Sequence, residues 1–301
     1  MRLLQLCREP HLYSCQRLTQ AAEKAGYAMD ILDPNRFLLK ITQGHLQAYY
    51  QTCEPFQKIR EVPQPIAEYV GVIGRFGSPS TEQGCRVLLH FERQQIACLN
   101  RANAFAMARD KWLSLQTLAS AGIAVPDSLI AGDLLKGADL SVQLPAPMVI
   151  KTLIGSQGVG VMLAEGEKSA QSLFDTLIAS KVASLAQAFI HEAQGHDIRA
   201  FVVGGEVVAA MQRIGQNGDF RANIHQGGRA RAIKLSVEEQ ALAIKAANVI
   251  GLDVAGVDLI RAKHGVMVLE VNASPGLEMI EKVSGVDIAG KMIASLLAKK
   301  S

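Results

Sequence analysis

The chain has 301 residues and a mass of 32.3 kDa, enough for two or three domains, with the composition of a soluble globular protein. A net charge of +3 with scattered Lys and Arg argues against a nucleic-acid partner. The spacing of the five cysteines is not that of metal ligands. The apolar run at the amino terminus is too short for a secretory signal. No stretch reaches the roughly 18 apolar residues that cross a membrane. We therefore expect a reduced, cytoplasmic protein without a membrane partner.

The amino-terminal third predicts a small α/β domain, because strands and helices alternate there. Strands are expected at 3–6, 28–32, 69–73 and 98–100, with helices at 14–25 and 81–97. A helix at 110–121 and a strand at 123–125 begin a second unit.

The rest of the chain predicts two α+β lobes separated by a polar break at 191–196. The expected strands are 148–152, 161–164, 184–190, 197–203 and 206–214, the last two joined by a Gly-Gly turn. The expected helices are 169–180, 237–250, 277–283 and 286–298. We predict an amino-terminal α/β domain at 1–100, a central lobe at 101–190 and a carboxyl-terminal lobe at 191–301.

Two apolar segments near the end of the chain predict a β-hairpin with a three-residue loop that ends at Gly265. In that register Ala262 faces Val266, and counting outward places Asp258 opposite Glu270. Residues that face each other on neighbouring strands lie ~5 Å apart.

Asn272 shares a face with Glu270, because side chains alternate along a strand. Asp258, Glu270 and Asn272 therefore form an all-oxygen set of the kind that magnesium binds together with substrate phosphates. The alternative is a polar strand end that faces water. The apolar neighbours argue against it, since buried carboxylates without partners are costly.

A glycine-rich loop between the strands expected at 148–152 and 161–164 is the second candidate site. It contains Gly155, Ser156, Gln157, Gly158 and Gly160. The loop joins two strands and does not open a helix, which excludes a P-loop and a Rossmann fingerprint. We interpret it as a flap over nucleotide phosphates, with an ordinary turn as the alternative.

Several cations are candidates for binding anions. Lys151 precedes the glycine-rich loop, and Lys111 lies at a helix start, where the helix dipole does not favour a cation. Arg221 and Asn223 share a face if their segment is a strand, and are candidates for the transferring phosphate. Arg75 between two glycines is a candidate for a substrate carboxylate. For each lysine, plain solvent exposure is the alternative.

The ordered motifs of the chain resemble the ATP-grasp superfamily, and specifically the RimK-type ligases that add glutamate to a carboxyl terminus. The motifs are Pro10–Ser14, Arg75–Gly77, Ala108–Lys111, Gly155–Gly160, Asp197–Arg199, Phe220–Asn223, His225–Gly228, Ala255–Asp258 and Glu270–Gly276. The resemblance spans essentially the whole chain. It implies an ATP-grasp fold, in which two α+β lobes clamp ATP, preceded by a small Rossmann-like α/β domain.

The resemblance also implies roles for individual residues. The ATP phosphates would be contacted by Lys111, Lys151 and the loop 155–160, and the ribose by Asp197. The adenine would lie against Gln187, Ala188, Phe189 and Ile190. The γ-phosphate would be contacted by Arg221, Ala222 and Asn223. Asp258, Glu270 and Asn272 would ligate two magnesium ions, or manganese. The family usually has Glu where this chain has Ala188. Because adenine contacts at such a hinge come largely from the backbone, we expect binding to survive.

By the same resemblance, the expected function is ATP-dependent ligation of L-glutamate to a carboxyl-terminal protein or peptide acceptor through an acyl phosphate. The expected acceptor is the sixth protein of the small ribosomal subunit, and a homo-oligomer is expected. The alternatives are a ligase for a small-molecule cofactor or a carrier protein, and a nucleotide-binding regulator without catalysis. A nicotinamide dehydrogenase is excluded, because no glycine-rich turn follows the first strand at residues 7–13.

Overall fold

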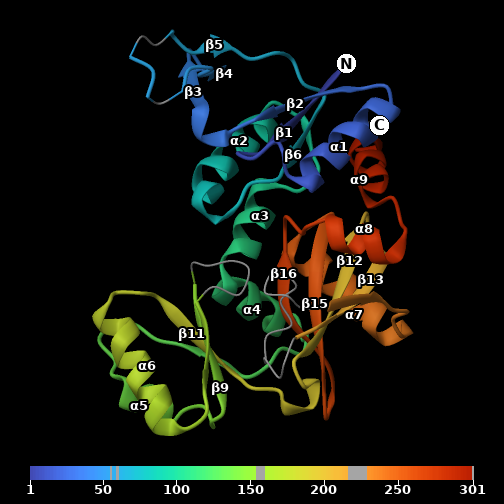
Figure 1. Ribbon diagram of the computed structural model, residues 1–301. Helices are drawn as coiled ribbons and strands as arrows, with labels where there is room; N and C mark the ends of the chain where they lie inside the picture. Colours follow the sequence, from blue (N-terminus) through green and yellow to red (C-terminus); the bar gives the residue numbers. More distant parts are fainter. Residues whose placement is uncertain (55, 59–60, 154–159, 216–228, 300–301) are drawn as a thin grey trace.

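The computed structural model describes the whole chain except residues 55, 59–60, 154–159, 216–228 and 300–301. Figure 1 shows an amino-terminal domain above two lobes, with both chain ends on that domain. In the described part, no helix is long and apolar enough to cross a membrane.

A four-stranded parallel sheet with the order β2-β1-β6-β7 forms the amino-terminal domain. Its elements are β1 (Arg2–Leu6), α1 (Tyr13–Lys24), β2 (Ala28–Leu32), β6 (Gly71–Gly74), α2 (Thr81–Arg93) and β7 (Ala97–Cys98). These confirm the predicted alternation, although α2 ends four residues earlier than 97.

A small antiparallel sheet was not predicted. It consists of β3 (Phe37–Thr42), β4 (His45–Tyr50) and β5 (Gln64–Pro65). Gln43 and Gly44 form the turn between the first two strands, both with positive φ. A Gln-Gly pair between two β-prone segments is a hairpin signal that sequence reasoning overlooked.

Two consecutive helices, α3 (Ala102–Arg109) and α4 (Lys111–Ser120), lead out of this domain. Asp110 separates them and caps α4, because its carboxylate accepts hydrogen bonds from the amides of Trp112 and Leu113, both at 3.0 Å. The predicted strand at 123–125 is wrong. Those residues precede Pro126 and lie outside any ladder, and the strand of this region is β8 (Ser128–Ile130).

The central lobe is a four-stranded sheet of order β10-β9-β11-β8, covered by two helices. Its other elements are α5 (Gly137–Ser141), β9 (Met148–Thr152), β10 (Val161–Ala164), α6 (Glu167–Ala179) and β11 (Ser184–Ala188). The bounds of β9 and β10 match the prediction, and these strands pair antiparallel on either side of the glycine-rich segment.

The carboxyl-terminal lobe is a five-stranded sheet of order β14-β13-β12-β15-β16 with three helices. Its elements are β12 (His196–Val203), β13 (Glu206–Ile214), β14 (Arg229–Ala232), α7 (Val237–Ile250), β15 (Val254–Ala262), β16 (Gly265–Asn272), α8 (Glu278–Ser284) and α9 (Ile288–Ala298). Ser236 and Glu239 form a reciprocal capping box at the start of α7, and Gly251 ends it with φ +85°, which confirms the predicted bounds.

The pairing of β15 with β16 corrects the predicted register. Ala262 faces Gly265 and not Val266, so the turn is one residue shorter than predicted. A bulge at Leu269 then adds one residue to β16, and Asp258 does pair with Glu270.

The buried apolar residues form three clusters with an uneven distribution. Two clusters join the amino-terminal domain to the carboxyl-terminal lobe. In one of them, which contains Leu18 and Leu296, α1 packs on α9. The third lies wholly inside the central lobe, around Ile150 and Phe174. The central lobe therefore has a core of its own.

Candidate functional site

The larger of two neighbouring cavities lies between the central and carboxyl-terminal lobes. It has an empty volume of about 650 Å³, part of which is open to solvent. Its lining is Val149, Lys151, Val161, Gln187, Ala188, Phe189, Ile190, Ala193, Gly195, His196, Asp197, Ile260 and Leu269. Apolar walls with a few polar groups are typical of a cofactor-sized ligand site.

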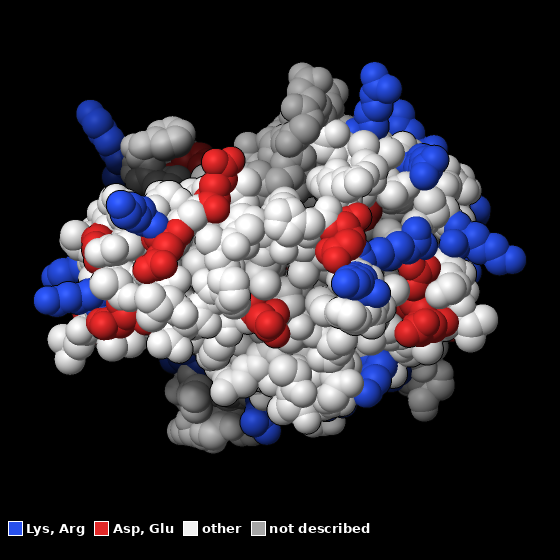
Figure 2. Space-filling model, turned by 90° about the horizontal axis from the view of Figure 1, so that it is seen from below, with Lys and Arg blue, Asp and Glu red and all other residues white. Residues whose placement is uncertain are grey.

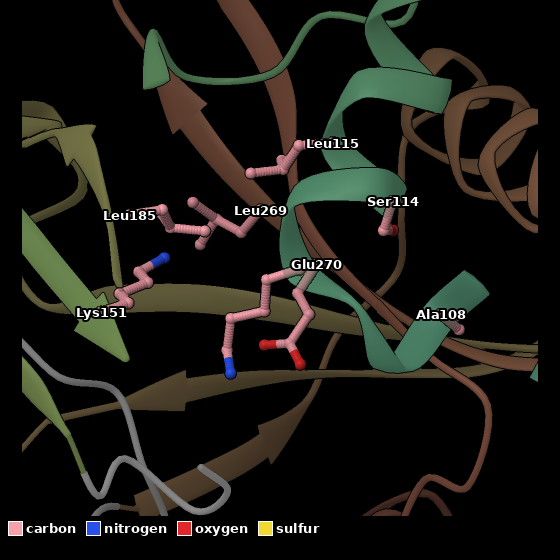
Figure 3. A pocket seen from close by; sticks show the side chains of 8 residues that line it. Ala108, Ser114, Leu115, Lys151, Leu185, Leu269 and Glu270 are labelled. Atoms are coloured by element: carbon pink, nitrogen blue, oxygen red, sulfur yellow. The ribbon is translucent and has the colours of Figure 1, made fainter. Parts of the chain in front are cut away.

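The smaller cavity adjoins the larger one, since Lys151 and Leu269 line both. Figure 3 shows Leu115, Leu185 and Leu269 gathered on one side, while the Glu270 carboxylate points away from them. The bulge at Leu269 brings this side chain into both cavities. Sequence reasoning missed Leu269, because a bulge leaves no pattern in an apolar strand.

Lys151 is a half-buried lysine on β9. Its Nζ donates to Oε1 of Gln187 at 2.6 Å, and Nε2 of Gln187 donates to Oγ of Ser128 at 3.1 Å. Burial lowers the pKa of Lys151, and the nearby Glu270 carboxylate opposes that shift. The hydrogen bond with Gln187 places this charge at the junction of the two cavities.

Lys111, the first residue of α4, reaches the end of β9. Its Nζ donates to the carbonyls of Thr152 and Leu153, at 3.2 and 3.1 Å. At the other end of the loop, Gly160 has φ +76°, and a Cβ there would lie 2.2 Å from Oγ1 of Thr152. This position therefore requires glycine. Gly155, Ser156, Gln157 and Gly158 lie outside the described residues.

Four charged side chains form a buried network across β13, β12 and β15. Asp197 accepts two hydrogen bonds of 2.6 Å from Arg213. Asp258 accepts from Arg199 through both carboxylate oxygens and lies 2.8 Å from Nη2 of Arg213. Sequence reasoning gave no role to Arg199 or Arg213. Arg199 stands two residues after Asp197 on one strand, which indicates a shared face.

The network acts differently on its two carboxylates. Burial raises the pKa of Asp258, but the charges and hydrogen bonds of Arg199 and Arg213 outweigh it and hold the pKa below its usual range. Burial dominates at Asp197 and raises its pKa despite Arg213. Asp258 is therefore firmly ionised and neutralised by protein groups.

The predicted metal ligands are only partly available. Glu270 lies on β16 at the smaller cavity, and Asn272 donates through Nδ2 to the carbonyl of Gly256 at 3.4 Å, which leaves its Oδ1 for a cation. Asp258 pairs with Glu270 in register, but both of its oxygens hold arginines. In the described residues, no group of three or more His, Cys, Asp or Glu could hold a metal ion. Glu270 and Asn272 fit magnesium, and Asp258 fits only after its ion pairs open.

The segment Gln187–Ile190 lines the larger cavity, and Ala188 is the last residue of β11. The amide of Ala188 donates to the carbonyl of Asp127 at 2.8 Å. Arg221, Ala222 and Asn223 lie outside the described residues.

The surface offers no concentrated charge on the face shown in Figure 2. Basic side chains lie mostly around its rim, and acidic ones are interspersed with them. This pattern agrees with the small net charge of +3.

Comparison with known proteins agrees with this arrangement. A model of the RimK-like ATP-grasp domain matches residues 108–296, and one of the RimK pre-ATP-grasp domain matches residues 1–105. A probable alpha-L-glutamate ligase of Pasteurella multocida is 56% identical over 301 residues, covering 99% of this chain and 95% of the relative. A protein of the same name from Haemophilus influenzae is 54% identical over 295 residues, covering 97% and 96%.

Solved structures show the same fold at low sequence identity. The ATP-grasp ligase PsnB in complex with a minimal precursor superposes with a TM-score of 0.73 at 21% identity, covering 99% of this chain and 98% of PsnB. A RimK domain ATP-grasp protein of Sphaerobacter thermophilus gives 0.69 at 19% identity, covering 98% and 99%. The chain therefore belongs to the RimK-like ATP-grasp family and is an ATP-dependent ligase.

Proposed function

We propose that this ligase joins L-glutamate to the carboxyl terminus of a protein or peptide, with a small-subunit ribosomal protein as the acceptor. The similarity to probable alpha-L-glutamate ligases along almost the whole chain carries the proposal. The site supports it, because the larger cavity has the size and apolar lining that a nucleotide needs.

In this proposal the nucleotide spans the two cavities. The base lies against the hinge Gln187–Ile190 and Leu269, and the phosphates extend toward the ammonium groups of Lys151 and Lys111. Asp197, which lines the larger cavity, holds the ribose. The loop 155–160 covers the phosphates, with Arg221, Ala222 and Asn223 at the γ-phosphate.

Magnesium is proposed at the carboxylate end of the site, with two ions as the expected number and manganese as a substitute. Glu270 and Asn272 supply oxygen ligands, and Asp258 joins them when Arg199 or Arg213 releases it. The ion would neutralise developing charge on the transferring phosphate. PsnB has been solved with magnesium and ADP.

An amine does not displace oxide from a carboxylate, because oxide is a very poor leaving group. The proposed chemistry therefore begins by activating the acceptor carboxylate. An oxygen of the acceptor carboxylate attacks the γ-phosphorus, ADP leaves, and a mixed acyl phosphate forms. The deprotonated amine of glutamate then attacks the acyl carbon and expels inorganic phosphate. Lys151 and Lys111 stabilise phosphate charge, and the two lobes supply orientation.

The test incubates purified protein with ATP, magnesium, L-glutamate and isolated small-subunit ribosomal proteins, followed by intact-protein mass spectrometry. We expect one protein to gain whole glutamyl residues and ADP to form in proportion. Glu270→Ala should abolish both signals, and Glu206→Ala, at an exposed turn carboxylate, should not.

ATP turnover without a modified protein would contradict the protein acceptor and favour a small-molecule acceptor or a carrier protein. If the protein binds ATP but does not hydrolyse it with any acceptor tested, the result would favour a nucleotide-binding regulator without catalysis. The expected homo-oligomer is checked by analytical ultracentrifugation of the same sample.

A further inference from the structure

Two half-buried arginines next to the site have solvent-shielded guanidinium nitrogens without partners. Arg75 directly follows β6, and its Nε and Nη1 are shielded from solvent but make no hydrogen bond in the described structure. Arg109 ends α3, and its Nε is shielded and unpartnered too. Its Nη2 donates to the carbonyl of Phe76 at 2.6 Å, and its guanidinium lies 5.3 Å from the centre of the Phe105 ring.

Neither arginine has a carboxylate in salt-bridge range among the residues that the structure describes. Burial lowers the pKa of both groups, and the charge of Arg109 lowers that of Arg75 further. Only the thiols of Cys7 and Cys15 oppose the shift at Arg75, and Glu270 and the thiol of Cys85 do so at Arg109. Arg199 and Arg213 differ from them, since carboxylates neutralise both.

An unpaired buried charge is costly, and buried donors are almost always satisfied. Two such arginines close together therefore form a place that suits an anionic ligand.

The location of Arg75 also indicates a ligand. The sheet order β2-β1-β6-β7 makes the boundary between β1 and β6 the point where the winding of the chain reverses. Ligands of open parallel sheets bind at the carboxyl ends of strands at such a point. Arg75 follows β6 there, and Cys7 follows β1.

Arg109 connects this end of the sheet with the proposed reaction centre. Its neighbour Ala108 lines the smaller cavity together with Glu270. An anion held by both guanidiniums would thus lie beside the carboxylate end of the nucleotide site, on the side of the amino-terminal domain.

We propose that Arg75 and Arg109 form a subsite for a non-reacting carboxylate of one of the ligase's substrates. This rests on the proposed function, which brings to the site L-glutamate and an acceptor end that itself carries glutamate once a first residue has been added. The planar fork of arginine suits a carboxylate, whereas the lysines Lys111 and Lys151 face the nucleotide cavities. Both candidate ligands present a carboxylate to the two arginines: one is the substrate glutamate, and the other is the acceptor.

The test compares Arg75→Met with the wild-type protein and with Arg86→Met, which removes an exposed arginine paired only with Glu82 on α2. Steady-state kinetics use L-glutamate, ATP and a synthetic peptide that ends in Glu-Glu. We expect the KM of one carboxylate substrate to rise about 10- to 100-fold, with the KM of ATP unchanged. A rise for glutamate assigns the subsite to glutamate, and a rise for the peptide assigns it to the acceptor.

Thermal unfolding provides a readout that needs no turnover. Arg75→Met should keep or raise the Tm, because it removes a buried charge without partners. At least one of the two carboxylate ligands, L-glutamate or the peptide, should raise the Tm of the wild-type protein and not that of Arg75→Met. Unchanged KM values, or equal ligand-induced shifts in both proteins, would overturn the subsite. A wild-type protein that makes no product would overturn the proposed function instead, while the thermal shifts would still decide on the subsite.

Discussion

The central lobe and the rest of the molecule are held together in different ways. We call the amino-terminal domain, the helices α3 and α4 and the carboxyl-terminal lobe together the body, because both helices contribute to its buried cluster. Two apolar clusters run through the body, and buried polar contacts reinforce it: Glu281 accepts from Tyr13, Arg17 and the amide of Ala289, each at 3.0 Å. The central lobe packs around a separate core and meets the body across the cavities.

This difference divides the proposed catalytic groups. The half-buried Lys151 and its partner Gln187 belong to the central lobe, whereas Glu270 and Asp258 belong to the body. A ligand in the cavities therefore touches two parts that do not share a core.

The largest effect is expected inside the core of the central lobe. Phe174→Ala should destabilise that lobe by about 3–5 kcal/mol, because a buried aromatic ring is replaced by a cavity. Calorimetry should show an early transition that shifts while the transition of the body stays in place. Phe201→Ala, in the body, is the matched variant and should shift the other transition. A single transition that moves equally in both variants would show that the two parts unfold together.

Removing one charge from each side of the cavity should cost catalysis and not stability. Lys151→Met and Glu270→Gln should each lower kcat by about 10²–10³-fold, which is roughly 3–4 kcal/mol of transition-state stabilisation. Initial rates of ADP formation measure the effect, and Lys168→Met, at an exposed lysine of α6, is the control. If a variant keeps activity within a few-fold of the wild-type value, the altered residue has no catalytic role in the site.

Asn100 tests the connection inside the body. Its Nδ2 donates to the carbonyls of Val254 and Ala273 at 2.8 and 3.0 Å, and its Oδ1 accepts from the amide of Val254 at 2.9 Å. Asn100→Ala leaves these buried groups without partners and should cost about 2–3 kcal/mol. Urea unfolding followed by circular dichroism should show the loss in the transition of the body alone. A loss of stability confined to the transition of the central lobe would contradict the assignment of Asn100 to the core of the body.

The smallest effect concerns the capping box of α7. Burial raises the pKa of Glu239, but Arg261 and Ser236 outweigh it, so its folded pKa lies below the ordinary value of 4.5. Its contribution is therefore complete above that value and is lost as the pH falls through the folded pKa. Glu239→Gln should cost about 1 kcal/mol at pH 7. In a series of unfolding curves the difference from wild type should shrink below about pH 4; a constant difference would contradict the ionic role.

Strong local signals explain which parts of the fold were predictable. Ser236 and Gly251 mark both ends of α7, and Gly204-Gly205 forms the expected two-residue turn with positive φ at both residues. The sheet of β3, β4 and β5 was missed because its strands are half-exposed and lack a clear alternation.

The pairing of Asp258 with Glu270 was correct, although two details of the hairpin were wrong. The turn is one residue shorter than predicted and the bulge adds one residue, so the two errors cancel. The ion pairs of Asp258 were beyond sequence reasoning. Arg199 lies 59 residues away, and only the tertiary pairing of β12 with β15 brings them together.

The packing of α9 on α1 has a consequence for synthesis on the ribosome. The amino-terminal domain emerges first, yet α1 packs on α9, and Leu18 and Leu296 belong to one buried cluster. The apolar surface of α1 therefore stays uncovered until α9 has been synthesised. A variant that lacks α9 exposes this surface permanently, which makes it a substrate for chaperones and proteases.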